Sequence, residues 1–197
     1  MCLYYHKNAI MRMMKKKDKI IVILGQTATG KSDFAVQVAK AVGGEISSAD
    51  SRQVYKGMDL GTGKITKKEM QGIKHHMLDV ASPKKVFTVA DFKKHTDKII
   101  EKIVGNKKVP IICGGTGFYI DAVIDNTVFP EVPPDTKLRK ELAKKSAPEL
   151  YKILLGLDKE RAKNIDNNNP VRLMRAIEIA KALGKVPKIS KSSKYDV

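Results

Sequence analysis

The sequence predicts an α/β protein that has a parallel β-sheet core and a group of helices towards the carboxyl end. Short runs of β-branched residues alternate with helix-like segments over the first two thirds of the chain. Two of these runs end directly at a glycine, as strands that lead into a turn and a helix do. Strand and helix alternating in this order indicate parallel strands joined by right-handed crossovers.

The first predicted elements lie within residues 20–49. Ile20–Leu24 is a short β-branched run, which is typical of a parallel strand buried on both faces. A helix is predicted over Lys31–Val42, ending at the glycine pair 43–44, and its apolar face consists of Phe34, Val38 and Ala41. Glu45–Ala49 is the second predicted strand.

The next elements extend the sheet. His76–Val80 is a weaker strand candidate. Thr88, with Asp91 three residues later, forms a capping box and predicts a helix that continues to about Val104. Two more elements complete this part of the chain, a buried strand at Val109–Cys113 and a helix at Phe118–Ile124.

After the segment FPEVPP, Phe129–Pro134, only helices are predicted. The first covers Asp135–Lys145. The caps of the others are Ser146 with Glu149, then Asp158, then Asn169 before Pro170, and the last helix ends at Gly184. The tail from Lys185 has no periodicity. We therefore expect a disordered basic leader at 1–18, an α/β core at 19–128, a helical insert or appendage at 129–185 and a tail at 186–197.

Charge is the most unusual feature of the composition. The 197 residues include 38 Lys and Arg against 21 Asp and Glu, which gives a formal net charge of +17. Such an excess favours a polyanionic partner, nucleic acid first and an anionic membrane surface second. Solvated, lysine-rich surfaces explain the composition about equally well.

Several classes of protein are excluded. Cys2 and Cys113 are the only cysteines and have no metal-binding or redox spacing, so a disulfide framework is excluded and a reducing cytoplasm is expected. The longest apolar run, Ile20–Leu24, is too short for a membrane span or a signal peptide.

A phosphate-binding loop is predicted where the first strand meets the first helix. The stretch GQTATGKS fits the pattern G-x-x-x-x-G-K-[ST] in the strand–helix context that the pattern requires. Its backbone N–H groups and the helix N-terminus attract an anion. Lys31 can neutralise phosphate oxygens, and the Ser32 hydroxyl can join a Mg²⁺ shell. The core is therefore expected to resemble that of P-loop NTPases, with a polyphosphate of unspecified kind bound by Gly25, Gln26, Thr27, Ala28, Thr29, Gly30, Lys31 and Ser32.

Two similar-looking patterns are not predicted as sites of their own. GTGK at Gly61–Lys64 copies the end of the motif, but Met58 stands where a glycine is required and no strand precedes it. We expect a surface loop there that is able to contact a ligand. His75 and His76 lack a third metal ligand at a useful spacing, which favours a strand-edge or substrate-loop role.

Asp50 is the best candidate for a reactive carboxylate, at the end of the second predicted strand. Ser51, Arg52 and Gln53 follow it on the same loop. A glutamine amide can pair with N6 and N7 of adenine, so this loop suits reading a base and accepting a proton. An equally good interpretation is that Asp50 or Ser51 caps a helix while Tyr55 packs.

Six segments resemble the tRNA dimethylallyltransferases, also called tRNA isopentenyltransferases, in order and approximate spacing. They are GQTATGKS, SADSRQVYKGMDLGTGK, HHMLDV, FTVADF, IICGGTGFYIDAVI and NNNPVRLMRAIEIAKALGK. The resemblance extends from Lys19 to about Val197. It implies that the P-loop holds the diphosphate of dimethylallyl diphosphate. The dimethylallyl group would pass to N6 of adenosine 37 in tRNA, with release of diphosphate.

The resemblance also implies roles for individual residues. Asp50 would remove the N6 proton, Thr27 would lie near the reacting centre, and Lys31, with Mg²⁺ at Ser32, would stabilise the departing diphosphate. The implied tRNA contacts are Asp50, Ser51, Arg52, Gln53, Thr116, Arg139, Val171, Arg172, Leu173, Met174 and Arg175. We expect the arginines at 172 and 175 to share one helix face and Val171, Met174 and Ile177 to share a core face.

The implied partners are dimethylallyl diphosphate and the anticodon stem-loop of tRNA, and the implied cofactor is Mg²⁺. A cytoplasmic monomer with no membrane partner is expected. The helices at 129–185 would bind tRNA. The tail at 186–197 would lead to a core strand that this chain lacks, because members of the family usually continue further, so the activity of these residues alone stays open.

Three other functions stay open. One is an adenylate isopentenyltransferase that acts on AMP, ADP or ATP, which the basic charge and the helical segment disfavour. The others are a P-loop small-molecule kinase and a non-catalytic tRNA-binding fragment.

Overall fold

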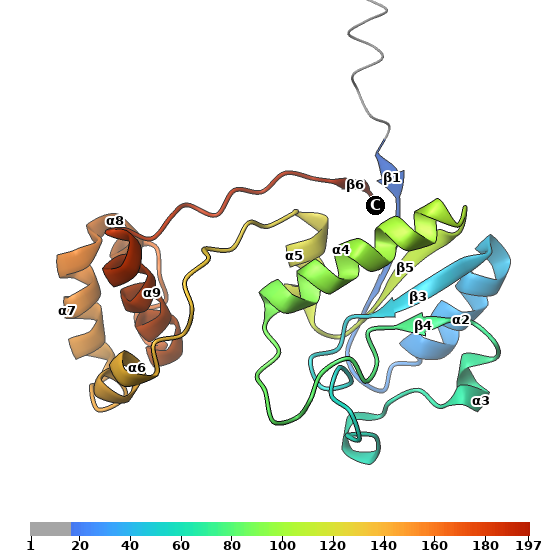
Figure 1. The fold of residues 1–197 in the computed structure, drawn as a ribbon, viewed down its shortest axis with the longest axis horizontal. Helices are drawn as coiled ribbons and strands as arrows, with labels where there is room; N and C mark the ends of the chain where they lie inside the picture. The colour runs from blue at the N-terminus through green and yellow to red at the C-terminus, as the bar shows by residue number, and fades with distance from the viewer. Residues whose placement is uncertain (1–16) are drawn as a thin grey trace, which may run out of the picture. The chain divides into compact units, whose positions relative to one another are not determined.

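The computed structural model describes residues 17–197, which form two compact units (Figure 1). The first unit is an α/β core made of residues up to Thr127 together with Lys191–Val197, and the second is a helical unit, Val128–Ser190. Because the chain returns to the core at Lys191, the helical unit is an insert and not an appendage. Most of the leader expected at 1–18 lies outside the described residues, but Asp18 already belongs to a strand.

The core contains a four-stranded parallel sheet with the order β2-β5-β3-β4. Its strands are β2 (Ile21–Leu24), β5 (Val109–Gly114), β3 (Gly44–Ser48) and β4 (His75–His76). In the register of the sheet, Ile111 of β5 lies opposite Ile21 on one side and Ile46 on the other. The predicted parallel α/β architecture is therefore confirmed.

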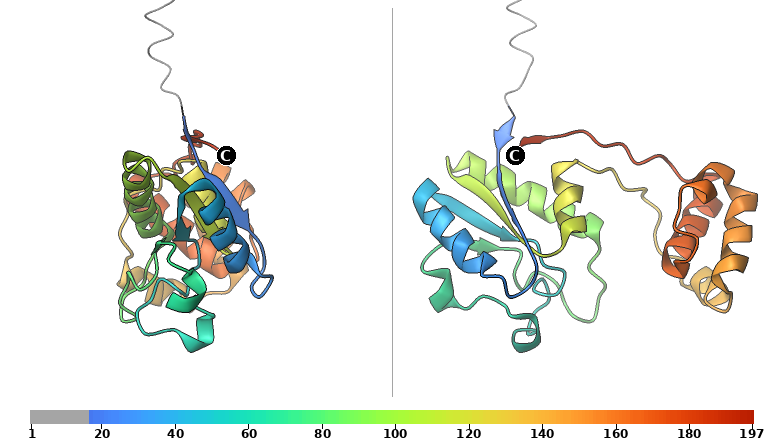
Figure 2. Two further views of the ribbon diagram at one scale, coloured as in Figure 1. Left: turned by 90° about the vertical axis from the view of Figure 1, so that its right-hand side faces the viewer. Right: turned by 180° about the vertical axis from the view of Figure 1, so that it is seen from behind.

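Helices cover both faces of this sheet (Figure 2). They are α2 (Lys31–Val42) on one face, and α4 (Val89–Gly105) and α5 (Gly117–Ile124) on the other. Successive residues of a strand point to opposite faces. Ile111 accordingly packs with Val36 of α2, whereas Ile112 packs with Phe92 of α4. Thr88 forms the predicted capping box with Asp91 at the start of α4.

Two predictions about strands are wrong. Ile20–Leu24 was expected to be buried on both faces, but β2 is an edge strand of the described sheet and its Leu24 is 59% exposed. The apolar run indicates a strand without indicating its place in the sheet. His76–Val80 is not a strand beyond His76, because Met77 and Asp79 adopt left-handed backbone, with φ of 64° and 56°, which interrupts strand pairing.

The tail also differs from the prediction. β6 (Tyr195–Asp196) pairs in parallel with β1 (Asp18–Lys19) in a separate two-stranded sheet. Tyr195 is buried, and its hydroxyl donates to Asp97 Oδ1 of α4 at 3.1 Å. This buried tyrosine helps to anchor the segment, and the periodicity of the sequence gives no indication of it. The sequence also left unpredicted the short helices η1 (Leu60–Thr62) and α3 (Lys67–Met70).

The insert contains four helices around its own core. They are α6 (Thr136–Leu142), α7 (Ala147–Leu157), α8 (Lys159–Lys163) and α9 (Pro170–Leu183). The last three begin after the predicted caps Ser146, Asp158 and Asn169, and Gly184 ends α9 with a left-handed backbone. The first was predicted over Asp135–Lys145 but is shorter, because Asp135 is its cap and it ends at Leu142. The core of the insert includes Leu150, Leu154, Leu173 and Ile177.

Glu178 forms a buried ion cluster with Arg139 and Arg175 in the insert. We call these three residues the Glu178 cluster. Its side chain is 2% exposed. Oε1 accepts hydrogen bonds from Arg139 Nε at 2.9 Å and from the Asp135 backbone N–H at 2.6 Å, and Oε2 accepts from Arg139 Nη2 at 2.8 Å and from Arg175 Nη1. Burial disfavours the ionised form, but the hydrogen bonds outweigh it and lower the pKa of Glu178 to about 2.

From the Glu178 cluster we predict how the stability of the insert depends on pH. The pKa of Glu178 is lowered from 4.5 to about 2. The ionised carboxylate therefore stabilises the folded insert fully above pH 4.5, and this contribution to the free energy of unfolding is lost as the pH falls towards 2. Glu178→Gln should flatten the pH dependence of the free energy of unfolding in this window. Urea unfolding followed by circular dichroism measures this, because the protein has no tryptophan.

The matched control is Glu160→Gln. Glu160 pairs with Lys188 on the surface of the same unit and its side chain is 68% exposed, so its contribution is small. If Glu178→Gln retained the full pH dependence of the unsubstituted protein, the carboxylate would contribute nothing as an ion.

The second prediction about stability concerns substitution of Gly114. A Cβ added at Gly114 would overlap the backbone carbonyl of Ala49, which cannot move without disturbing β3. We expect Gly114→Ala to lower the free energy of unfolding of the core by about 2 kcal/mol or more. Gly105→Ala is the control, since a Cβ there meets open space at the end of α4 and should cost nothing. Equal stability of the two variants in urea would contradict the prediction.

Candidate active site

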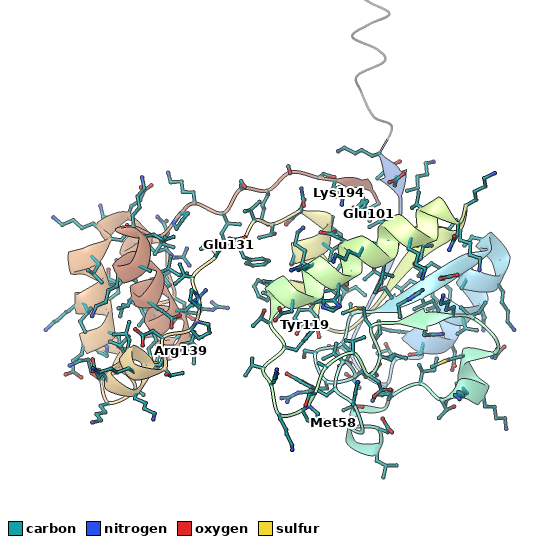
Figure 3. The ribbon with its side chains drawn as sticks, in the orientation of Figure 1. Met58, Glu101, Tyr119, Glu131, Arg139 and Lys194 are labelled. Atoms are coloured by element: carbon teal, nitrogen blue, oxygen red, sulfur yellow. The ribbon has the colours of Figure 1, made fainter. Side chains whose placement is uncertain are left out.

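Three loops that carry predicted site residues meet at one edge of the core sheet. They follow the carboxyl ends of β2, β5 and β3, which are adjacent in the sheet. The carboxyl edge of a parallel sheet is where ligands of such folds bind. Figure 3 labels Tyr119 and Met58, which lie on this side of the core.

The loop after β2 has the geometry of a phosphate-binding loop. Gly30 adopts a left-handed backbone with φ of 78°, which favours glycine, and α2 begins at the next residue. The N-terminus of α2 therefore opens directly into the loop, where unpaired N–H groups attract an anion. Lys31 Nζ donates to Gln26 O at 2.5 Å, so the ammonium lies over the loop. The predicted phosphate-binding residues, 25–32, are brought together in this turn.

The loop after β3 orients Asp50. Its Oδ1 accepts from the backbone N–H groups of Arg52 at 2.8 Å and Gln53 at 3.2 Å, which closes a tight turn. The side chain therefore caps a turn and not a helix. This turn uses only Oδ1 of the carboxylate.

The loop after β5 joins the other two. The Thr116 backbone N–H donates to Ala49 O at 3.0 Å, and Thr116 Oγ1 accepts from the Ser51 N–H at 3.0 Å. On its other side, a Cβ at Gly115 would lie 3.3 Å from Gly25 O and 4.0 Å from Thr27 Oγ1. Contact with both loops brings the predicted site residues Thr27, Asp50 and Thr116 into one place.

Gln53 has a different position from the one its residue type suggests. Its Oε1 accepts from Ser48 Oγ at 3.2 Å, and its Nε2 donates to Thr62 O at 3.2 Å and to Gly63 O at 3.1 Å. The amide thus ties the 58–63 loop to β3. Pairing with adenine would require breaking these bonds, so in this structure Gln53 supports the site and does not present a free edge for reading a base.

Lys64 is held in the same region by acidic groups. Its side chain is 6% exposed, and Nζ donates to Asp59 Oδ1 and Asp79 Oδ1, each at 2.6 Å, and to Tyr55 O at 3.0 Å. Burial disfavours the charge, but these hydrogen bonds outweigh it and raise the pKa of Lys64. The lysine of GTGK therefore holds its own loop in place through three hydrogen bonds.

In the insert, the predicted tRNA-binding residues divide into exposed and buried ones. Arg172 is exposed and Val171 is 70% exposed, so Val171 is not the core residue we expected. Leu173 is fully buried and Met174 packs against the core, because Leu173, Ala176 and Ile177 form the inner face of α9. The side chain of Leu173 is thus unavailable to a ligand, whereas that of Met174 is only partly buried. Arg139 and Arg175 both bind Glu178.

The sequence prediction missed several residues that shape these sites. The contacts of Lys64 give no clear signal, because one of its two acidic partners, Asp79, lies 15 residues further along the chain. Tyr119 donates to Phe87 O at 3.3 Å and stacks on Phe92, which fixes the segment before α4 beside the site. Glu178 did leave a signal, since it is the only charged residue in the apolar run AIEIA.

Metal-binding and membrane-spanning features are limited in the described part of the chain. Among residues 17–197, no group of three or more His, Cys, Asp or Glu side chains could hold a metal ion, and His75 and His76 lie in β4. No helix there is long and apolar enough to cross a membrane.

Comparison with known proteins assigns the family. A family model described as IPP transferase matches residues 53–196. A tRNA dimethylallyltransferase of Oceanobacillus iheyensis is 45% identical over 172 residues, which cover 85% of this chain and 55% of that protein. Another, from Caldicellulosiruptor saccharolyticus, is 42% identical over 193 residues, which cover 92% of this chain and 62% of that protein. The chain thus spans little more than half the length of these relatives.

Solved structures agree with these sequence matches. The tRNA isopentenylpyrophosphate transferase of Bacillus halodurans is 39% identical with a TM-score of 0.58, covering 86% of this chain and 57% of that one. A eukaryotic dimethylallyltransferase acting on tRNA is 29% identical with a TM-score of 0.78, covering 91% of this chain and 46% of that one. Since the family model alone accounts for more than half of the residues, the chain belongs to the IPP transferase family.

Proposed function

We propose that this protein transfers a dimethylallyl group from dimethylallyl diphosphate to N6 of adenosine 37 in tRNA. The observation that carries the proposal is the junction of the Asp50 turn and the phosphate-binding loop through Gly115 and Thr116. A base and a diphosphate site side by side suit a reaction in which a diphosphate leaves as an amine attacks. The names of the relatives support the same chemistry.

In the proposed reaction the bond between the allylic carbon and the diphosphate oxygen breaks as the bond from N6 to that carbon forms. Negative charge grows on the leaving diphosphate, and the loop N–H groups and Lys31 stabilise it. The exocyclic amine is a poor nucleophile because its lone pair is delocalised into the ring. Asp50 accepts the N6 proton as the new bond forms, so that the nitrogen does not become positively charged. Thr27, whose Oγ1 lies 4.0 Å from the position of a Cβ on Gly115, is assigned to contact the reacting centre.

The residues present fit Mg²⁺ only together with diphosphate. Ser32 is exposed in the first turn of α2 and offers a hydroxyl, and the described residues hold no carboxylate cluster that would bind the ion alone. Mg²⁺ commonly takes most of its ligands from substrate phosphates and water. When bound at Ser32 it would supply positive charge to the leaving group.

The acceptor is proposed to be the anticodon stem-loop of tRNA. An adenosine in a loop can be extruded into a pocket at lower cost than one in a duplex. The net charge of +17 and the exposed Arg139 and Arg172 suit phosphate contacts. We further propose that the protein acts as a monomer in the cytoplasm.

Asp50→Asn tests the proposed mechanism. Asparagine keeps Oδ1 as an acceptor for the Arg52 and Gln53 N–H groups, so the turn should survive while the base is lost. We expect transfer of labelled dimethylallyl to an anticodon stem-loop RNA to fall by about 10²–10⁴-fold. Affinity for the RNA, measured separately, should stay within a few-fold.

The control is Asp121→Asn, an exposed aspartate of α5. If Asp50→Asn abolished RNA binding while turnover of each bound complex stayed normal, Asp50 would bind RNA and would not be the base. Transfer of the γ-phosphate of ATP, with no use of dimethylallyl diphosphate, would identify the protein as a kinase instead.

A further inference from the structure

Glu178 is an acidic residue in a position where an apolar one is expected. It lies on the buried side of α9, in a run where Ala176, Ile177, Ile179 and Ala180 are all buried. Removing a carboxylate from water is costly, and it is tolerated only when charged partners and hydrogen bonds compensate. Both charged partners of Glu178 are arginines, one from α6 and one from α9.

The geometry of the Glu178 cluster fixes both arginines. Arg139 binds Glu178 with two parallel hydrogen bonds, through Nε and Nη2, which holds the plane of its guanidinium group. Arg175 donates from Nη1 to Glu178 and from Nη2 to Val132 O at 2.9 Å, so it also holds the segment before α6. Figure 3 labels Arg139 among the side chains of the insert.

Each arginine still has N–H donors that neither Glu178 nor Val132 uses. A guanidinium group has five N–H donors, and two are used in each case, which leaves five minus two, or three. The side chain of Arg139 is 44% exposed and that of Arg175 is 36% exposed. A phosphate can therefore reach the outer edges without displacing Glu178.

We propose that Glu178 is a positioning residue that holds Arg139 and Arg175 in the orientation in which their outward N–H groups bind RNA phosphates. This inference rests on the proposed function, because it takes tRNA as the ligand. A free arginine loses side-chain entropy when it binds a phosphate, whereas one already held by a carboxylate loses less. The buried carboxylate of Glu178 thus holds the two arginines in the orientation that binds the RNA.

The opposite effect of Glu178 is also physically reasonable, and it predicts a change of opposite sign. If the carboxylate only neutralised the arginines, its removal would raise the positive charge of the insert. RNA binding would then become tighter and more salt-dependent. If Glu178 positions the arginines, its removal makes binding weaker and less salt-dependent, because fewer phosphates are contacted at once.

The test is RNA binding by Glu178→Gln, measured by fluorescence anisotropy with an anticodon stem-loop RNA over a series of KCl concentrations. We expect affinity to fall roughly tenfold at fixed salt, and the slope of log K against log salt to become shallower by about 1. Glu160→Gln, which alters an exposed ion pair of the same insert, should bind like the unsubstituted protein.

Double variants separate positioning from general destabilisation. In an Arg139→Ala background, Glu178→Gln should have much less effect than in the unsubstituted protein, because it acts through that arginine. In an Arg172→Ala background it should keep its full effect, since Arg172 pairs with Asp166 and does not contact Glu178. Circular dichroism at the assay temperature establishes whether each variant is folded.

If Glu178→Gln unfolds the insert, Arg139→Lys tests the proposal in its place. Lysine keeps the charge and cannot form the paired hydrogen bonds, so a positioning role predicts a loss close to that of Arg139→Ala. Tighter or unchanged RNA binding by folded Glu178→Gln, or normal binding by Arg139→Lys, would overturn the proposal while leaving the proposed function intact. If the unsubstituted protein failed to bind the RNA, both would fall.

Discussion

The candidate site depends on the position of β5 between β2 and β3. Parallel pairing on both sides of this strand brings three carboxyl ends to the same level, and each end begins a loop that carries site residues. The contact between Gly114 and Ala49 is so close that only glycine fits. The distance between the phosphate loop and the Asp50 turn is therefore set by the backbone of the sheet and not by flexible side chains.

Buried carboxylates organise the charge of this basic protein in both units. Glu45 of β3 is 4% exposed and lies between His76 Nε2 at 2.7 Å and Lys108 Nζ at 2.9 Å. Burial disfavours its ionised form, yet the hydrogen bonds with these two groups outweigh burial and lower the pKa of Glu45. Glu178 has the same arrangement with two arginines. In each case one buried acid holds two basic side chains in place.

The elements with local signals could be predicted from the sequence. The capping pairs at Thr88 and Ser146 and the motif before Lys31 are decided by residues that are close in the chain, and the structure has helices at all three places. The edge position of β2, the anchoring of Tyr195 and the exposure of Val171 depend on distant segments. No local pattern contains that information.

The candidate site, like the secondary structure, could be predicted only in part. Asp50 was indicated by its place after a predicted strand, Thr27 by the phosphate-loop motif and Thr116 by a resemblance between sequences, and the structure brings their three loops together. The commitment of the Gln53 amide to Thr62 and Gly63, and that of Lys64 to Asp59 and Asp79, could not be found in this way. The type of a residue indicates what its side chain can bind, whereas the fold determines which partners lie within hydrogen-bonding distance.

The place where the insert joins the core has a consequence for how such proteins can vary. Ser192 N–H donates to Asp125 O at 2.8 Å, and Asn126 Nδ2 donates to Ser192 Oγ at 3.4 Å, so the outgoing and returning chains are bonded to each other. A closed junction of this kind lets the inserted sequence be lengthened, shortened or exchanged with little entropic cost to the sheet. The sequence of the insert can therefore change while the loops at the carboxyl edge of the core sheet keep their positions.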